Sequence, residues 1–210
     1  MSNLFLRGWN WCRRFRHRCG YGVHSPSDFF LITFVVYERL PFYAYSLLHA
    51  KRKDVVSLSH YREKVDRLLF RLVNYLQPAA MLEVGTGSGL SARYMAEAKH
   101  VPLYTLDSGE CRGEVIRLLA DCPQVDYRCG DIVHIAFTPY YKEVFEALLP
   151  AVSSHTCFFI GSPYATKEKR EWWKQVISDP RTGVTFDLYD VGLVFFDKKR
   201  VKEHRIVNFL

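Results

Sequence analysis

Apolar residues recur along this chain in two patterns, and the two patterns alternate. Between Ser59 and Gln77 they have the three-and-four spacing of one helix face, which comprises Tyr61, Val65, Leu68, Leu69, Leu72, Val73 and Leu76. The run from Ala79 to Val84 is uninterrupted and predicts a buried strand. Strands that alternate with helices indicate an α/β fold built on a parallel sheet.

The alternation continues after Val84. It predicts helices at 90–99, 109–122, 140–149 and 167–178, and strands at 102–108, 125–129, 132–137 and 155–160. Alternating residues at 184–189, turn residues at 190–192 and an apolar run at 193–196 predict a closing antiparallel hairpin, and 205–210 could add a short tail strand. We therefore expect one sheet with helices on both faces.

Two of these predicted strands are too close together. Adjacent parallel strands need a crossover of about a dozen residues, but only Gly130 and Asp131 separate 125–129 from 132–137. Either 125–137 is one long or bulged strand, or one strand of the sheet is missing or rebuilt. We favour the second interpretation, a trimmed sheet.

The domain prediction is a basic helical extension at 1–57 followed by the α/β domain at 58–210. Within the extension, Ser25, Pro26 and Asp28 have the spacing of an N-cap, a first helical residue and a capping box. The helix that they start should run to about Arg39. Because this segment is apolar on nearly all sides, we expect it to be buried.

Most of the net positive charge lies in this extension. Residues 1–60 hold nine Lys or Arg and three Asp or Glu, which accounts for six of the seven net charges. Residues 3–19 mix five arginines with six large apolar residues and no acid, so they could form an amphipathic basic helix. This helix could contact an anionic membrane surface or nucleic-acid phosphates. We favour a third interpretation, in which its aromatic side packs on its own domain or on a partner subunit of a homodimer.

Composition bounds the setting of the protein. At 210 residues and 49% hydrophobic content, the chain suits one domain with a modest extension. Its six cysteines include no CxxC pair and no zinc-finger spacing, which favours reduced thiols and no structural metal. No uncharged apolar run approaches a membrane span, and Arg7 and Arg13 interrupt the N-terminus before a signal peptide could form. We expect a cytoplasmic protein.

The candidate chemistry centres on Leu82–Gly89, where a strand turns into a helix through three glycines. Glycines permit positive φ and close approach of a ligand. A dinucleotide site would need a third glycine at position 90, where Leu90 stands. Glu83 also precedes the first glycine, and a carboxylate there suits a cationic or hydrogen-bond-donating ligand better than a pyrophosphate.

This stretch resembles the first motif of class I S-adenosylmethionine-dependent methyltransferases, E-x-G-x-G-x-G. The resemblance implies a Rossmann-like methyltransferase sheet with S-adenosylmethionine as cofactor, held by Glu83, Gly85, Thr86, Gly87, Ser88 and Gly89. Asp107, with Ser108 after it, ends the next predicted strand 22 residues after Gly85, where an acid accepts hydrogen bonds from ribose hydroxyls. Alternatively, Asp107 only caps the following helix.

The same resemblance places Gly130 and Asp131 near the adenine, although an ordinary turn explains this pair nearly as well. Metal-dependent methyltransferases of the catechol type carry acidic or amide ligands after the fourth and fifth strands. The matching positions, near Ala136 and at Gly161-Ser162, hold none, so we expect no catalytic magnesium.

Two further stretches extend the resemblance over nearly the whole chain except about 110–140. GYGVHSP at 20–26 and LLFRLVNYLQP at 68–78 are similar to an uncharacterised methyltransferase-like family common in Bacteroidetes. This resemblance implies the fold and the cofactor but no substrate.

The leading hypothesis is methyl transfer to a small-molecule acceptor. Its methyl donor is already activated, so the protein mainly has to align donor and acceptor, with one base to take a proton. Candidates for that base are His24 and Tyr21, if the N-terminal segment covers the cleft, and Tyr164 after the strand at 155–160. The alternatives are a catalytically degenerate fold that serves as a binding or scaffold protein, and a nucleic-acid methyltransferase recruited by the basic arm.

Overall fold

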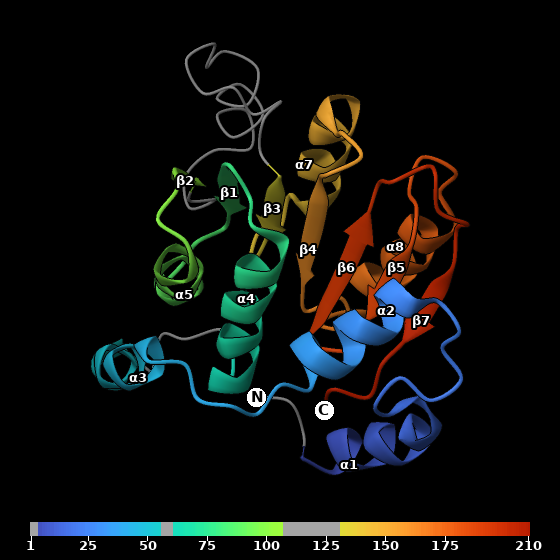
Figure 1. The fold of residues 1–210 in the computed structure, drawn as a ribbon. Helices are drawn as coiled ribbons and strands as arrows, with labels where there is room; N and C mark the ends of the chain where they lie inside the picture. Colours follow the sequence, from blue (N-terminus) through green and yellow to red (C-terminus); the bar gives the residue numbers. More distant parts are fainter. Residues whose placement is uncertain (1–3, 56–60, 107–130) are drawn as a thin grey trace.

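The computed structural model describes residues 4–55, 61–106 and 131–210 (Figure 1). Its strands are β1 (Met81–Val84), β2 (Leu103–Leu106), β3 (Ile132–Ile135), β4 (Cys157–Gly161), β5 (Thr185–Asp187), β6 (Val191–Phe195) and β7 (His204–Ile206). They form one sheet in the order β2-β1-β3-β4-β6-β5-β7. Only β6 is antiparallel to its neighbours, and it forms the predicted closing hairpin with β5.

Of the two predicted strands that are too close together, the second, at 132–137, is present as β3. β3 lies in the centre, parallel to β1 on one side and to β4 on the other. The expected strand at 125–129 and helix at 109–122 lie outside the described residues, so the trimmed sheet stays a prediction. The predicted tail strand is present as β7, parallel to β5 and slightly earlier than expected.

Helices cover both faces of the sheet, as predicted (Figure 1). They are α4 (Glu63–Leu76), α5 (Leu90–Ala98), α7 (Tyr141–Leu148), the short 3-10 turn η5 (Leu149–Ala151) and α8 (Lys167–Ser178). Alternate strand residues separate two cores, because successive side chains point to opposite faces. Met81 joins the core under α4 and α5, whereas Leu82 joins the core under α7 and α8.

The N-terminal region consists of α1 (Leu4–Arg13), the 3-10 turn η1 (Phe15–His17), α2 (Pro26–Phe30), the π-helical turn η2 (Leu31–Val36) and α3 (Ala44–Val55). The Ser25 hydroxyl accepts a hydrogen bond from the Asp28 amide, which confirms the predicted N-cap. The Asp28 carboxylate does not complete a capping box but pairs with Arg200 and Arg205.

The helix after Ser25 differs from its prediction in length and burial. It ends at Val36 rather than Arg39, and its last six residues are π-helical. Leu31, Ile32, Val35 and Val36 are in the core, but one side of the helix is exposed. Phe34 on that side packs against the Phe30 ring at a tilt instead of entering the core.

Candidate functional site

The glycine loop lies at the carboxyl edge of the parallel strands, where ligands bind in open α/β sheets. All three glycines have positive φ, at 83° for Gly85, 55° for Gly87 and 70° for Gly89. Gly89 is the N-cap of α5, and the Gly85 amide donates to the Leu106 carbonyl at the end of β2. The sequence motif therefore folds into the predicted strand-to-helix turn.

Gly85 approaches protein backbone closely. A Cβ atom at this position would lie 2.6 Å from the carbonyl carbon and oxygen of Phe137. Positive φ and this contact both require glycine, because any side chain would collide with the segment that leaves β3. Gly85 thus permits the close approach of the loop to the segment after β3.

Beneath the loop, Glu83 and His134 form a buried pair. They are register partners on β1 and β3, and both are 0% exposed. Glu83 Oε1 lies 2.8 Å from His134 Nδ1 and accepts a hydrogen bond of 2.6 Å from the Ser91 hydroxyl of α5. His134 Nε2 lies 3.1 Å from the Tyr61 hydroxyl. We call these three groups the Glu83–His134–Tyr61 network.

Tyr61 fills the space between the loop and β4. A Cβ atom on Gly161 would lie 2.0 Å from the Tyr61 hydroxyl, so Gly161 makes room for this side chain. Burial raises the pKa of Tyr61 well above its ordinary value, and the nearby Glu83 and Asp66 carboxylates add to the effect. The phenol is therefore neutral and can donate to His134.

A small hollow of about 10 Å³ lies beside Tyr61, between the loop, α4 and the segment after β3. Its lining includes Asp66, paired with Arg52 of α3, and Thr86. Burial, opposed by Arg52, raises the pKa of Asp66 to about 6. Two residues that line the hollow have a buried oxygen with no hydrogen-bond partner among the described residues, Asp66 Oδ1 and Thr86 Oγ1, and so does Glu83 Oε2 in the network beneath the loop.

These oxygens fit a cationic or hydrogen-bond-donating group, which is what the sulfonium and ammonium groups of S-adenosylmethionine offer. Buried acceptors without partners are uncommon in native proteins. The hollow, however, has about the volume of one water molecule. The types of residue present therefore fit the cofactor, whereas its full volume needs Tyr61 to be displaced.

The N-terminal arm, residues 4–25, lies against the carboxyl edge of the sheet (Figure 1). Arg7 donates two hydrogen bonds, of 2.8 and 2.7 Å, to the Asp190 carboxylate, and Arg14 pairs with Asp187 at 2.9 Å. The hydrogen bond to Asp190 raises the pKa of Arg7. We call these four residues the arm cluster.

Tyr164, a predicted catalytic base, lies beside the arm cluster and contacts it. Its hydroxyl bonds to the Asp187 carboxylate and accepts a hydrogen bond of 3.1 Å from Arg14. Burial and the Asp187 charge raise the pKa of Tyr164. Its ring stacks on Tyr189, with centroids 5.1 Å apart. The hydroxyl is thus engaged in holding the arm.

The other two predicted bases lie away from the loop. Tyr21 and His24 are on the connection from η1 to α2, which runs beside β7, whereas the glycine loop joins β1 to α5 (Figure 1). Both side chains are exposed, Tyr21 to 81%. The arm does cover the carboxyl edge, but the structure does not bring these two residues to the loop.

The remaining predicted cofactor contacts divide into two groups. Asp107, Ser108 and Gly130 lie outside the described residues, although β2 ends at Leu106, which pairs with Val84 just before the loop. Asp131 lies at the amino end of β3, where its carboxylate accepts a hydrogen bond of 2.6 Å from the Ala79 amide. Because β1 and β3 are parallel, Asp131 is at the opposite edge of the sheet from the glycine loop.

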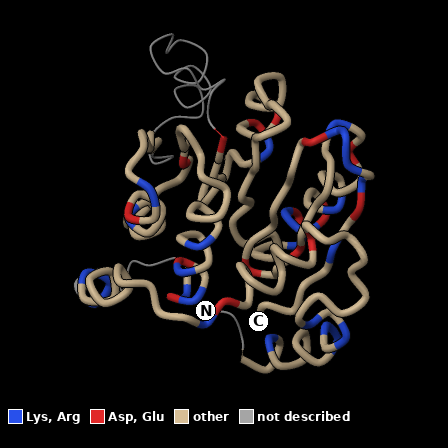
Figure 2. Tube along the Cα trace, in the orientation of Figure 1, with Lys and Arg blue, Asp and Glu red and all other residues tan. Residues whose placement is uncertain are grey.

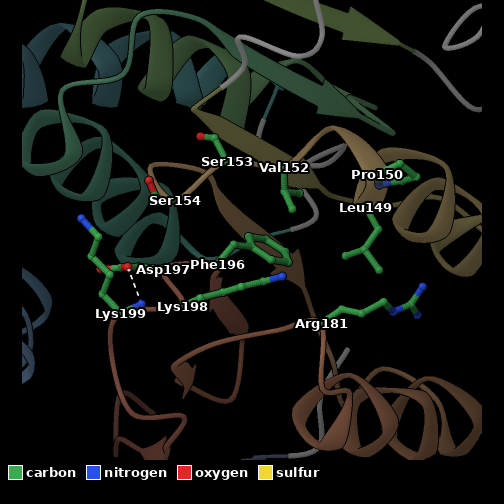
Figure 3. A pocket seen from close by; sticks show the side chains of 10 residues that line it. All are labelled: Leu149, Pro150, Val152, Ser153, Ser154, Arg181, Phe196, Asp197, Lys198 and Lys199. Atoms are coloured by element: carbon green, nitrogen blue, oxygen red, sulfur yellow. Dashed lines mark hydrogen bonds between the residues drawn. The ribbon is translucent and has the colours of Figure 1, made fainter.

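A larger hollow, of about 540 Å³, also lies at that opposite edge (Figure 3). It is bounded by residues that precede β4 and follow β6, among them Ser153, Phe196 and Lys198. Within its lining, the Asp197 carboxylate accepts a hydrogen bond from the Lys199 amide. Arg181 forms ion pairs with Glu146 and Asp179. This hollow and the glycine loop therefore lie at opposite ends of the strands.

Sequence reasoning missed His134, Tyr61 and the arm cluster. The available signal for His134 was a single polar residue inside an apolar strand. That signal points to a buried partner only once β3 is known to lie beside β1. Among the described residues, no group of three His, Cys, Asp or Glu is placed to hold a metal ion.

Comparison with solved structures shows the fold. A protein from Staphylococcus aureus, assigned provisionally as a caffeoyl-CoA O-methyltransferase, is 13% identical, with a TM-score of 0.55 over 81% of this chain and 98% of that one. An O-methyltransferase from Bacillus cereus in complex with S-adenosylhomocysteine is 13% identical, with a TM-score of 0.54 over 77% and 94%.

An O-methyltransferase from Streptomyces achromogenes involved in tomaymycin synthesis, in complex with S-adenosylmethionine, is 14% identical, with a TM-score of 0.50 over 78% and 93% of the two chains. No family model and no curated protein matches the sequence. At these identities the likeness establishes the fold alone, which is the Rossmann-like fold of class I methyltransferases with helices added at the N-terminus.

Proposed function

We propose that the protein transfers a methyl group from S-adenosylmethionine to a small-molecule acceptor. The observation that carries this proposal is the glycine loop, which joins β1 to α5 with three positive-φ glycines above a buried carboxylate. The structural relatives in complex with S-adenosylmethionine or S-adenosylhomocysteine support it through a shared fold.

Glu83, Thr86 and the backbone of the loop would hold the cofactor, and Asp107 would accept from its ribose. Two of these side chains have a buried oxygen without a partner among the described residues. When bound, the cofactor supplies a methyl group that is already activated for transfer. The protein then has to align the acceptor, exclude water and receive one proton.

The Glu83–His134–Tyr61 network can receive that proton. Once the cofactor has displaced Tyr61, His134 Nε2, which lies 3.1 Å from the Tyr61 hydroxyl in the closed arrangement, would accept the proton from the acceptor directly. Glu83, 2.8 Å from Nδ1, would stabilise the imidazolium that forms. His134 thereby takes the role that we had predicted for His24, Tyr21 or Tyr164.

One observation favours the alternative, a fold that binds a ligand without chemistry. Tyr61 fills the space beside the loop and leaves a hollow of only about 10 Å³. A protein that had lost catalysis could keep this closed arrangement permanently.

Calorimetric titration with S-adenosylhomocysteine tests the proposal. We expect binding, weakened roughly tenfold to a hundredfold by Asp107→Ala, because a charged hydrogen bond is worth about 1.5–3 kcal/mol. Asp131→Ala, at the opposite edge of the sheet, is the matched control and should keep the wild-type affinity.

Absence of binding by the wild-type protein would overturn the proposal. Binding together with a silent methyl-transfer screen across phenol, catechol, carboxylate and amine acceptors would favour the non-catalytic alternative. Binding to the wild type that Asp107→Ala leaves unchanged would remove Asp107 from the site.

A further inference from the structure

Helix α1 packs on the protein by its polar side and exposes its apolar side. Arg7 and Arg14, about two helical turns apart along the arm, face inward to the arm cluster, and Asn10 between them contacts Tyr189. Leu4 is 85% exposed and Trp9 is 60% exposed. A surface helix of a globular domain normally has the reverse orientation.

The outward side combines apolar and cationic groups. Leu6, Trp11 and Phe15 are exposed as well, and the Arg18 guanidinium stacks over the Trp11 and Phe15 rings. Arg13 and Arg16 are exposed alongside. Figure 2 shows basic positions and no acidic position on α1. We call this side of α1 and η1, from Leu4 to Phe15 with Arg13 and Arg16, the arm surface.

The composition of the arm surface distinguishes three possible occupants. Nucleic acid binds chiefly through contacts of Arg and Lys with phosphates, but two of the five arginines here are directed inward and exposed aliphatic residues take their place. A second copy in a two-fold dimer would bring Arg13 and Arg16 of both copies to one interface, which like-charge repulsion disfavours. An anionic bilayer matches both components, since its headgroups attract cations and its interface accepts Trp and Leu.

We propose that the arm surface binds the protein to anionic membrane surfaces, with α1 lying in the plane of the interface. None of the described helices is long and apolar enough to cross a membrane, and the proposal requires only shallow insertion. The arm cluster ties α1 to the carboxyl edge of the sheet, so a docked molecule would turn that edge towards the lipid. The connection from η2 to α3, on which Leu40 and Tyr43 are exposed, also runs along the lower end of the molecule (Figure 1).

This proposal does not depend on methyl transfer, and vesicle co-sedimentation of the full chain tests it. We expect binding to phosphatidylcholine vesicles that contain about 30 mol% phosphatidylserine and little binding to pure phosphatidylcholine. Leu4→Ser together with Trp9→Ser should lower the partition coefficient more than about tenfold. Arg13→Glu together with Arg16→Glu should lower it by at least about tenfold on the anionic vesicles.

Val201→Ser is the matched control, because Val201 is 80% exposed but lies outside the arm. Circular dichroism of each variant confirms that the fold is kept. Wild-type failure to bind anionic vesicles overturns the proposal, as does equal loss with Val201→Ser. A dimer in light scattering that Leu4→Ser/Trp9→Ser dissociates, without vesicle binding, would assign the arm surface to a second copy instead. Retention on RNA that Arg13→Glu/Arg16→Glu abolishes, without vesicle binding, would assign it to nucleic acid.

Discussion

Glu83 and His134 are the residues on which the interior beneath the glycine loop depends. Both are fully buried, and removing one partner of such a pair leaves the other in a site of low polarity. We expect His134→Leu to lower the free energy of unfolding by about 3 kcal/mol, measured by urea denaturation. Glu83→Gln in the same background should restore part of this loss, because a neutral amide is cheaper to bury than a carboxylate. Strictly additive effects of the two changes would contradict a coupled pair.

The close approach at Gly85 can be tested by an alanine substitution, with a substitution at Gly8 of the same chain as the control. Gly85→Ala should destabilise the protein by more than about 1–2 kcal/mol, because it combines positive φ with a Cβ atom 2.6 Å from the Phe137 carbonyl. Gly8 in α1 has nothing within 4 Å of a Cβ atom. Gly8→Ala should therefore raise helix stability by up to about 1 kcal/mol. Thermal unfolding of both variants measures the difference, and a neutral Gly85→Ala would refute the close approach.

Asp66 makes stability depend on pH in an unusual direction for an acid. Its pKa in the folded protein is about 6, above its ordinary value of 3.8, so the folded state binds the proton more tightly. This contribution to stability is fully present below pH 3.8 and is lost as the pH rises through about 6. We expect the stability difference between wild type and Asp66→Asn to fall by about 3 kcal/mol from acidic to neutral pH. Urea denaturation at a series of pH values measures this slope, and parallel curves for the two proteins would contradict it.

At the residue scale, the sequence predicted what local patterns encode. The glycine motif is local, because a strand must turn into a helix within a few positions, and Gly85, Gly87 and Gly89 have the expected φ. His134 could not be assigned, since its partner Glu83 is 51 positions away and their contact depends on strand register. The same holds for Tyr61, which reaches its site only because Gly161 lacks a side chain.

The N-terminal arm shows what the pattern of an element leaves open. The mixture of apolar residues and arginines predicted an amphipathic helix, and α1 is present, but its aromatic side does not pack on its own domain, one of the two packings that we expected, while packing on a partner subunit stays a prediction. The reverse orientation arises because the carboxyl edge carries Asp190, which binds Arg7 through two hydrogen bonds, and Asp187, which pairs with Arg14. Amphipathicity identifies the two sides of a helix, whereas the charge of the surface beneath decides which side docks.

This orientation predicts how the arm can be released. Arg7→Ala together with Arg14→Ala should expose the arm and increase the rate of tryptic cleavage at Arg13, Arg16 and Arg18 severalfold. Arg62 lies 3.6 Å from Asp190 and compensates only in part. Arg16→Ala, which changes an exposed arginine, is the control and should leave the cleavage rate at the other sites unchanged. An unchanged digestion pattern in the double variant would show that the arm cluster does not hold the arm.

For the whole molecule, strand direction follows from rules that the sequence satisfies. Helix α5 connects the parallel strands β1 and β2, helix α7 connects the parallel strands β3 and β4, and the turn at Asp190 gives the antiparallel β6. The N-terminal region could not be placed by such rules, because nothing local specifies that η2 joins the core under α4. Tyr61 and the arm cluster depend on that placement, and this is why sequence reasoning missed them.

The closed space beside the loop leads to a prediction for the molecule as a whole. If the proposed cofactor binds only after Tyr61 leaves its position, the affinity is reduced by the fraction of molecules in the open state. Tyr61→Ala removes the side chain that occupies the space over Gly161, so we expect S-adenosylhomocysteine to bind about tenfold more tightly than to wild type. Tyr75→Ala changes a tyrosine on α4 that stacks with Phe30, and it should not alter affinity. Calorimetry measures both variants, and weaker binding to Tyr61→Ala would show that Tyr61 contacts the cofactor instead of excluding it.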